Sequence, residues 1–121
     1  MSTTRTLLSL LLVCLFCACG VDQTLRKADK LWQIGEYADA AATYRKVYQQ
    51  LPSKEKVRKG AVSLQMARCY NRLNATPRAL AAYQTGLRYG QPTLHDRLTF
   101  ARLLLKAGQY QNAAHAFEAL R

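Results

Sequence analysis

The sequence lacks signals for strands and for catalytic chemistry. Runs that alternate apolar with polar residues are absent, and Ala, Leu, Arg, Lys and Gln dominate. The 121 residues include only two histidines and seven acids. His95 and His115 fall on different predicted helices, and no nucleophile, paired carboxylate, metal-ligand cluster or Gly-rich phosphate loop has the required spacing. We therefore predict an all-α protein that is not an enzyme and needs no cofactor or metal.

Cysteines are almost missing from the body of the chain. Three of the four lie within the first nineteen residues, as Cys14, Cys17 and Cys19, and Cys69 stands alone. A disulfide framework is therefore excluded. We interpret Cys69 as a small core residue and not as a reactive thiol.

A long hydrophobic run is also absent. The apolar segment from Leu7 to Ala18, interrupted only by Ser9, is about a dozen residues long, whereas a transmembrane helix needs roughly 20. With Arg5 ahead of it, this segment has the length of a secretory signal peptide. We expect residues 1–18 to be that peptide and the chain to leave the cytoplasm.

The end of this leader, Leu15 to Gly20, resembles a bacterial lipobox, with small residues on both sides of Cys19. Phe16 departs from the usual aliphatic residue. The resemblance implies cleavage before Cys19 and lipidation of that residue, with residues 19–24 as lipidated N-terminus and linker. Two or three acyl chains would anchor the protein firmly. Asp is absent directly after Cys19, and in the lipoproteins that this segment resembles such an absence favours the outer membrane. The resemblance therefore implies an outer-membrane lipoprotein of the cell envelope that faces the periplasm. The alternative is an ordinary signal peptide cut near Ala18.

One pattern recurs three times in the rest of the chain: a small or αL-tolerant residue, Ala five positions later and a large aromatic four after that. The copies are Gly35/Ala40/Tyr44, Asn74/Ala79/Tyr83 and Gly108/Ala113/Phe117. Gly adopts positive φ freely and Asn tolerates it, so the first residue of each copy predicts the turn of a helical hairpin. The Ala allows close approach of two helices and the aromatic fills the remaining space.

The second and third copies lie 34 residues apart, and this repeat resembles the tetratricopeptide (TPR) family. The resemblance implies a helical-hairpin solenoid over residues 25–121, with repeats at about 21–54, 60–93 and 94–121, the last incomplete. Two or three unrelated amphipathic hairpins are the alternative.

We expect Thr76 to cap a helix that Pro77 begins, and extra residues near Ser53–Lys59 to lengthen the next helix. The predicted core is Leu31, Ala40, Tyr44, Met66, Ala67, Tyr70, Ala79, Tyr83, Leu104, Ala113 and Phe117.

The last predicted helix, about Gln109 to Arg121, carries an apolar face that no capping helix covers. We expect the chain to be the N-terminal piece of a longer protein. Cover by a partner or by a second copy is the alternative.

Acidic residues are too few to balance the basic ones, and the formal net charge is +11. Export argues against nucleic acid as the partner. Anionic lipid headgroups, peptidoglycan-associated polymers or an acidic protein face are the expected counterparts. We interpret the basic cluster Lys54, Lys56, Arg58 and Lys59 as a solvated face.

A second basic set has helical spacing. In TPR proteins the first helix of each hairpin lines a concave groove, and the spacing then places six residues there. They are Arg68, Asn71, Arg72, His95, Arg102 and Lys106. Like charges four residues apart are slightly destabilising, which hints at an anionic target, although solubility alone is an equal explanation. The positions of the family's two-carboxylate clamp hold Leu25, Asp29, Gln65, His95 and Thr99, so the clamp is absent.

Six segments are similar to a narrower group, namely 26–32, 35–37, 40–41, 44–48, 52–56 and 69–70. These are outer-membrane lipoproteins with N-terminal TPRs, a β-propeller and an OmpA-like peptidoglycan-binding domain, one of them associated with type IX secretion. The resemblance implies a lipid-anchored TPR scaffold that mediates protein–protein interaction in the envelope, in a type IX-like secretion complex. A soluble periplasmic module that binds an anionic polymer or acidic partner through the basic groove is the alternative. Neither reading involves a small-molecule substrate.

Overall fold

The computed structural model describes residues 2–121, with side chains for residues 2–13 and 20–121. This part of the chain is entirely helical apart from its connections, as the all-α prediction requires. The helices are α1 (Ser2–Gln33), α2 (Tyr37–Gln50), α3 (Lys56–Arg72), α4 (Thr76–Tyr89), α5 (Leu94–Lys106) and α6 (Tyr110–Glu118).

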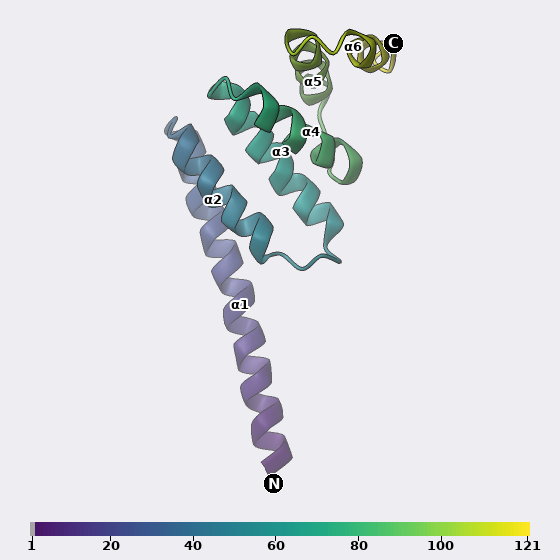
Figure 1. The fold of residues 1–121 in the computed structure, drawn as a ribbon. Helices are drawn as coiled ribbons and strands as arrows, with labels where there is room; N and C mark the ends of the chain where they lie inside the picture. The colour runs from purple at the N-terminus through teal and green to yellow at the C-terminus, as the bar shows by residue number, and fades with distance from the viewer. Residues whose placement is uncertain (1) are drawn as a thin grey trace.

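Helices that are adjacent in the sequence pack against each other. The extensive contacts join α1 to α2, α2 to α3, α3 to α4, α4 to α5 and α5 to α6, which produces a stack of antiparallel hairpins (Figure 1). Since each helix buries its apolar stripe mainly on its neighbours, the molecule is an array of helical hairpins.

The three short connections share one backbone conformation. Gly35, Asn74 and Gly108 have φ angles of 82°, 55° and 77°. The next residue donates its amide to the carbonyl five positions back, at 2.9 Å in each turn, and the turn residue donates to the carbonyl three positions back at 3.1 Å. This pair of bonds is the Schellman motif, which satisfies carbonyls left free at the end of a helix. The first helix of every hairpin therefore ends by the same mechanism.

The same turns set where the second helices begin. Glu36, Ala75 and Gln109 occupy the N-cap with φ between −86° and −81° and ψ near 68°. Our prediction that Thr76 caps its helix is wrong: Ala75 is the N-cap and Thr76 is already helical. The Schellman bond from the amide of Ala75 decides this, because it fixes the residue directly after Asn74 at the helix boundary.

The buried core residues recur at the positions of the sequence repeat. Ala40, Ala79 and Ala113 are buried, as are Tyr44 and Tyr83, so small residues mark the close crossings and aromatic rings fill the space beside them. Of the other predicted core residues, Ala67 and Leu104 are buried, and Leu31, Met66, Tyr70 and Phe117 are partly buried against them. The core therefore has the composition that the sequence predicts.

Two lengths vary between hairpins. Helix α3 has 17 residues and α5 has 13, so α3 is the longer of the two, as expected, but only Lys56–Lys59 of the extra residues are helical, because Ser53–Glu55 lie in the connection before α3. Helix α6 ends at Glu118, three residues before the predicted end, because a turn bonded to His115 and Phe117 follows it.

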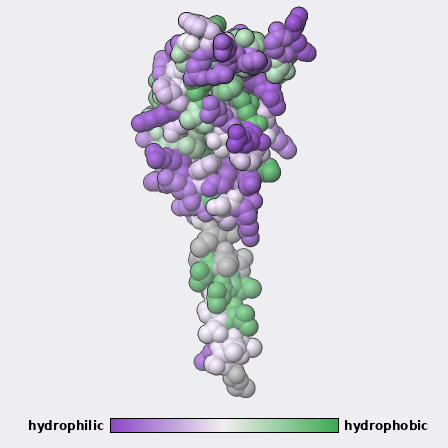
Figure 2. All heavy atoms as spheres, turned by 45° about the vertical axis from the view of Figure 1, so that its right-hand side comes forward, coloured by the Kyte–Doolittle hydropathy of each residue, from purple (hydrophilic) through white to green (hydrophobic). Residues whose placement is uncertain are grey.

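The N-terminal half of α1 projects away from the stack (Figure 1). Its apolar side chains from Leu7 to Val13 are exposed, and they form the green stretch on the projecting part in Figure 2. Among the side chains that the structure describes, Val21 and Leu25 are the first of α1 to contact the core. Cys14, Cys17 and the predicted lipidation residue Cys19 lie outside the residues whose side chains are described. Within the described residues, no helix is long and apolar enough to cross a membrane.

Candidate binding groove

The predicted groove residues lie on the first helices of the second and third hairpins. Arg68, Asn71 and Arg72 are on α3, and His95, Arg102 and Lys106 are on α5. Arg68 and Asn71 are half-buried, whereas the other four are exposed. The two helices therefore present a basic face. Its side chains differ in exposure and in whether their charges are paired within the protein.

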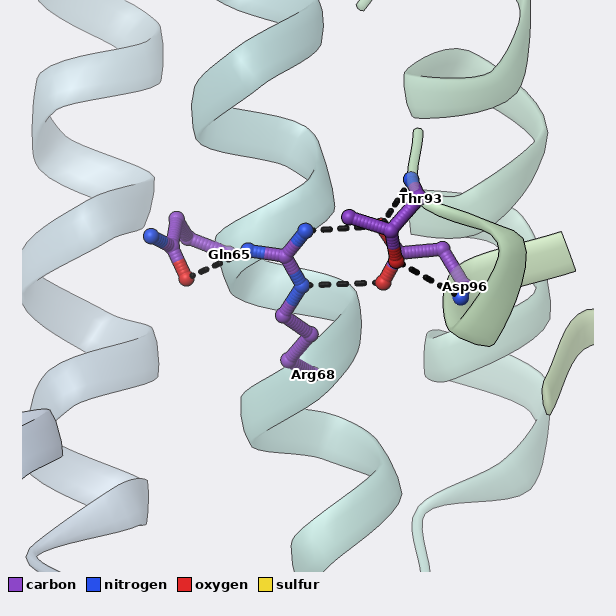
Figure 3. Close-up of polar contacts among 4 residues, drawn as sticks. All are labelled: Gln65, Arg68, Thr93 and Asp96. Atoms are coloured by element: carbon purple, nitrogen blue, oxygen red, sulfur yellow. Dashed lines mark hydrogen bonds and ion pairs between the residues drawn. The ribbon is translucent and has the colours of Figure 1, made fainter. Parts of the chain in front are cut away.

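Arg68 is engaged inside the protein. Its guanidinium forms two hydrogen bonds with the Asp96 carboxylate, at 2.9 Å from Nε and 2.7 Å from Nη2, and Nη1 donates to Gln65 at 3.2 Å (Figure 3). Such a bidentate pair is stronger than a single contact between charges. Since α3 carries Arg68 and α5 carries Asp96, the pair joins the second hairpin to the third.

Asp96 also takes part in the cap at the N-terminus of α5. Its backbone amide donates to Thr93 Oγ1 at 3.1 Å, and its carboxylate accepts from the Thr93 amide at 2.9 Å, which is a capping box. Burial by itself raises the pKa of the Asp96 carboxyl, but the hydrogen bonds from Arg68 and Thr93 outweigh it, so its pKa lies below the ordinary value. The bond to Asp96 likewise raises the pKa of the Arg68 guanidinium.

Arg72 connects the first hairpin to the second. Its guanidinium lies 5.9 Å from the centre of the Trp32 ring and 5.7 Å from that of Tyr37, and the two rings are 5.0 Å apart. These are cation–π distances. Arg68 and Arg72 therefore contribute to inter-hairpin packing, whereas Arg102 and Lys106 are exposed and have no ion pair within the described part of the chain.

Three of the five positions compared with the carboxylate clamp line an open hollow between α1 and α3, whereas His95 and Thr99 on α5 do not. Leu25, Asp29 and Gln65 line it together with Arg58, Ala61 and Val62, and its volume is about 210 Å³. The Asp29 carboxylate accepts a hydrogen bond from the buried Tyr44 hydroxyl. Burial, with that bond, raises the pKa of Tyr44 well above its ordinary range. The hollow therefore offers a carboxylate and an amide, with one cation at its edge.

Sequence reasoning missed Asp96, the buried acid at the centre of this face. The signal was present, because Thr93 and Asp96 have the spacing of a capping box ahead of an apolar helix. The pairing of Asp96 with Arg68 could not be predicted from the sequence, since 28 residues separate these two residues.

No metal or thiol chemistry is assembled on this face. The described residues contain no group of three His, Cys, Asp or Glu side chains that could hold a metal. Cys69 is buried, and burial raises its pKa to about 11, so its thiol stays protonated near neutral pH.

The fold and this face define the class of protein: an all-α array of helical hairpins packed mostly between neighbouring helices. In comparisons with protein families and with curated proteins, no family and no curated protein matches this chain.

Proposed function

We propose that this protein is a TPR-type scaffold that holds another protein against the face formed by α1, α3 and α5. The observation that carries the proposal is the threefold recurrence of one turn. Each copy has positive φ, the same two backbone bonds, a buried Ala five positions on and an aromatic four further. A repeat of hairpins builds an extended surface and not an enclosed site.

The inter-hairpin contacts support a rigid binding surface. Arg72 packs on Trp32 and Tyr37 of the first hairpin, and Arg68 is paired with Asp96 of the third. A pre-organised surface loses little entropy when it binds. Among the exposed cations of α5, Arg102 and Lys106 belong to the predicted groove, which favours a partner segment that carries acidic residues.

Membrane attachment through a lipid on Cys19 is the second part of the proposal. Apolar side chains from Leu7 to Val13 are exposed, and among the described residues that follow Cys19, Val21 packs against the core. Cleavage before Cys19 would remove the exposed apolar stretch and leave the stack complete. The product would be a scaffold of the bacterial envelope, in the setting of a type IX-like secretion complex.

Charge reversal on α5 tests partner binding. We expect Arg102→Glu with Lys106→Glu to lose a partner that the unchanged protein retains after cross-linking in the envelope fraction, identified by mass spectrometry. The matched control is Arg45→Glu with Arg78→Glu, which makes the same charge change on α2 and α4. Equal retention by both double variants would contradict binding on this face.

Fractionation tests the anchor. We expect Cys19→Ala to release the protein from membranes and to abolish the mass increase from acyl chains. A protein recovered in the soluble fraction both with and without Cys19 would instead be the soluble module, and one that stays in the membrane fraction in both forms would contradict a lipid anchor on Cys19. For that module, binding of an anionic polymer should weaken steeply as the salt concentration rises.

A further inference from the structure

The connection between α2 and α3 leads into the densest basic surface of the chain. Residues 54–59 contain four cations and one acid. Lys54, Lys56 and Arg58 are exposed and Lys59 is half-buried. Unlike Arg68, the three lysines have no ion pair within the described residues, so their charges are available to a partner.

Three of the cations on this surface lie beside aromatic rings. Lys59 Nζ lies 4.4 Å from the centre of the Tyr48 ring, and Lys56 Nζ lies 5.6 Å from that of Tyr89. Arg88, at the end of α4, also lies over Tyr89 at 6.0 Å. We call Lys54, Lys56, Arg58, Lys59 and Arg88 the basic end of the stack. Cations beside partly exposed tyrosines are a combination suited to the interface between water and lipid.

The start of α3 lies next to the α1 segment from which the chain leaves the stack. An ion pair of 3.4 Å connects Arg58 Nη2 to Asp22 Oδ1 of α1. Figure 1 shows the connection between α2 and α3 on the side of the stack toward which the free half of α1 projects. The exposed apolar residues of α1 therefore continue outward from the basic end (Figure 2).

The tether from an anchor to this surface would be short. Asp22 follows Cys19 by three residues, which span roughly 10 Å when fully extended and about 4.5 Å as helix. The Debye length at physiological ionic strength is about 8 Å. A lipid on Cys19 would therefore hold Arg58 and its neighbours within electrostatic range of the bilayer surface.

We propose that the basic end binds the anionic headgroups of the membrane and sets the orientation of the hairpin stack on it. The proposal rests on the proposed anchor for the short tether, while the charge and its location come from the described residues. Binding places the α2–α3 connection against the lipid. The groove cations Arg102 and Lys106 of α5 are left for a protein partner.

Vesicle binding by the purified full-length chain tests the proposal. The probes are phosphatidylcholine vesicles with and without phosphatidylglycerol. The test variant is the triple change Lys54→Gln, Lys56→Gln and Lys59→Gln. The control removes three charges elsewhere, by Lys30→Gln, Arg78→Gln and Arg121→Gln, and a Lys→Arg version of the test triple checks that charge and not folding is responsible.

We expect affinity for anionic vesicles to fall about fivefold for each test lysine removed, the fold-change that corresponds to ~1 kcal/mol per charge near such a surface. The Lys→Arg version should restore binding, and the control triple should lose much less. Equal losses in the two triples, or equal binding to both kinds of vesicle, would overturn the proposal. So would equally tight binding of soluble polyphosphate through the same three lysines. Cys19→Ala probes the anchor separately, so that the two proposals can fail independently.

Discussion

Asp96 is the residue whose environment most changes the interpretation of this chain. Its side chain is 1% exposed, and it accepts bonds from Arg68 on α3 and from the Thr93 amide at the start of its own helix. A buried carboxylate is tolerated only when its hydrogen-bonding capacity is filled. Arg68, which helical spacing assigned to the groove, therefore also supports the joint between the second and third hairpins.

Removing this charge should destabilise the protein. We expect Asp96→Asn to lower the free energy of unfolding by about 3 kcal/mol, because the half-buried Arg68 loses its partner. Urea denaturation followed by circular dichroism measures the change. The control is Glu118→Gln, which breaks an ion pair whose side chains are more than two-thirds exposed and should cost little. Equal effects of the two variants would contradict the role given to Asp96.

The same pair predicts a dependence on pH. The pKa of Asp96 is lower in the folded state, so its contribution to stability is complete above the unfolded value, about 3.9, and is lost as pH falls through the folded value. We expect the stability difference between the unchanged protein and Asp96→Asn to be constant above about pH 5 and to shrink below pH 4. A difference that stays constant down to the acid limit would argue against an ionised Asp96.

At the scale of helices, α3 and α4 approach each other closely at two glycines. A Cβ on Gly60 would lie 2.4 Å from the amide nitrogen of Gly90, and one on Gly86 would lie 2.4 Å from Leu64 Cδ2. Backbone cannot move aside as a flexible side chain can, so glycine at position 60 allows the start of α3 to touch the end of α4. This contact also supports the basic end.

We expect Gly60→Ala to destabilise the protein by about 1–3 kcal/mol through overpacking, despite the higher helix propensity of Ala. Thermal unfolding measures it. The matched control is Gly20→Ala, where an added Cβ meets no atom within 4 Å, and its melting temperature should be unchanged or slightly higher. A neutral effect of Gly60→Ala would show that the two helices can separate without cost.

The third hairpin allows a second test at this scale. Ala113 is 1% exposed and packs with Leu103 and Leu104 of α5. We expect Ala113→Glu to unfold this hairpin, because a close helix contact would have to bury an unpaired charge. Hydrogen exchange should show loss of protection in α5 and α6, while Ala114→Glu, at an exposed neighbouring position, leaves protection intact. Unchanged protection in both variants would contradict the packing.

Across the whole molecule, residues 2–13 of α1 are exposed and stand apart from the stack. Among the residues whose side chains are described, Val21, Leu25 and Ala28 are the first of α1 to join the core. We expect a chain that begins at Cys19 to unfold in urea with the same midpoint as the full chain and to stay soluble at higher concentration. A midpoint lowered by the truncation would mean that the leader contributes to the fold.

Much of the fold could be predicted from the sequence because its determinants are local. Gly35 and Gly108 reach positive φ without steric cost, Asn74 tolerates it, and an Ala five residues on marks the helix crossing. Thr76 shows the limit of such reasoning: it has the residue type of a cap, but the preceding turn placed the helix boundary at Ala75. The capping preference of a residue type does not decide where a helix begins when the preceding turn already fixes the backbone groups at that boundary.

The sequence by itself determined the helices, their turns and the apolar residues that they bury, since these depend on spacing within a few helical turns. Only the tertiary structure decided which charges are free. It paired Arg68 with Asp96 across 28 residues, laid Arg72 on two aromatic rings and brought Arg58 beside Asp22. The physical reason is that an ion pair or cation–π contact depends on distance in space, and helical periodicity does not report the distance between separate helices.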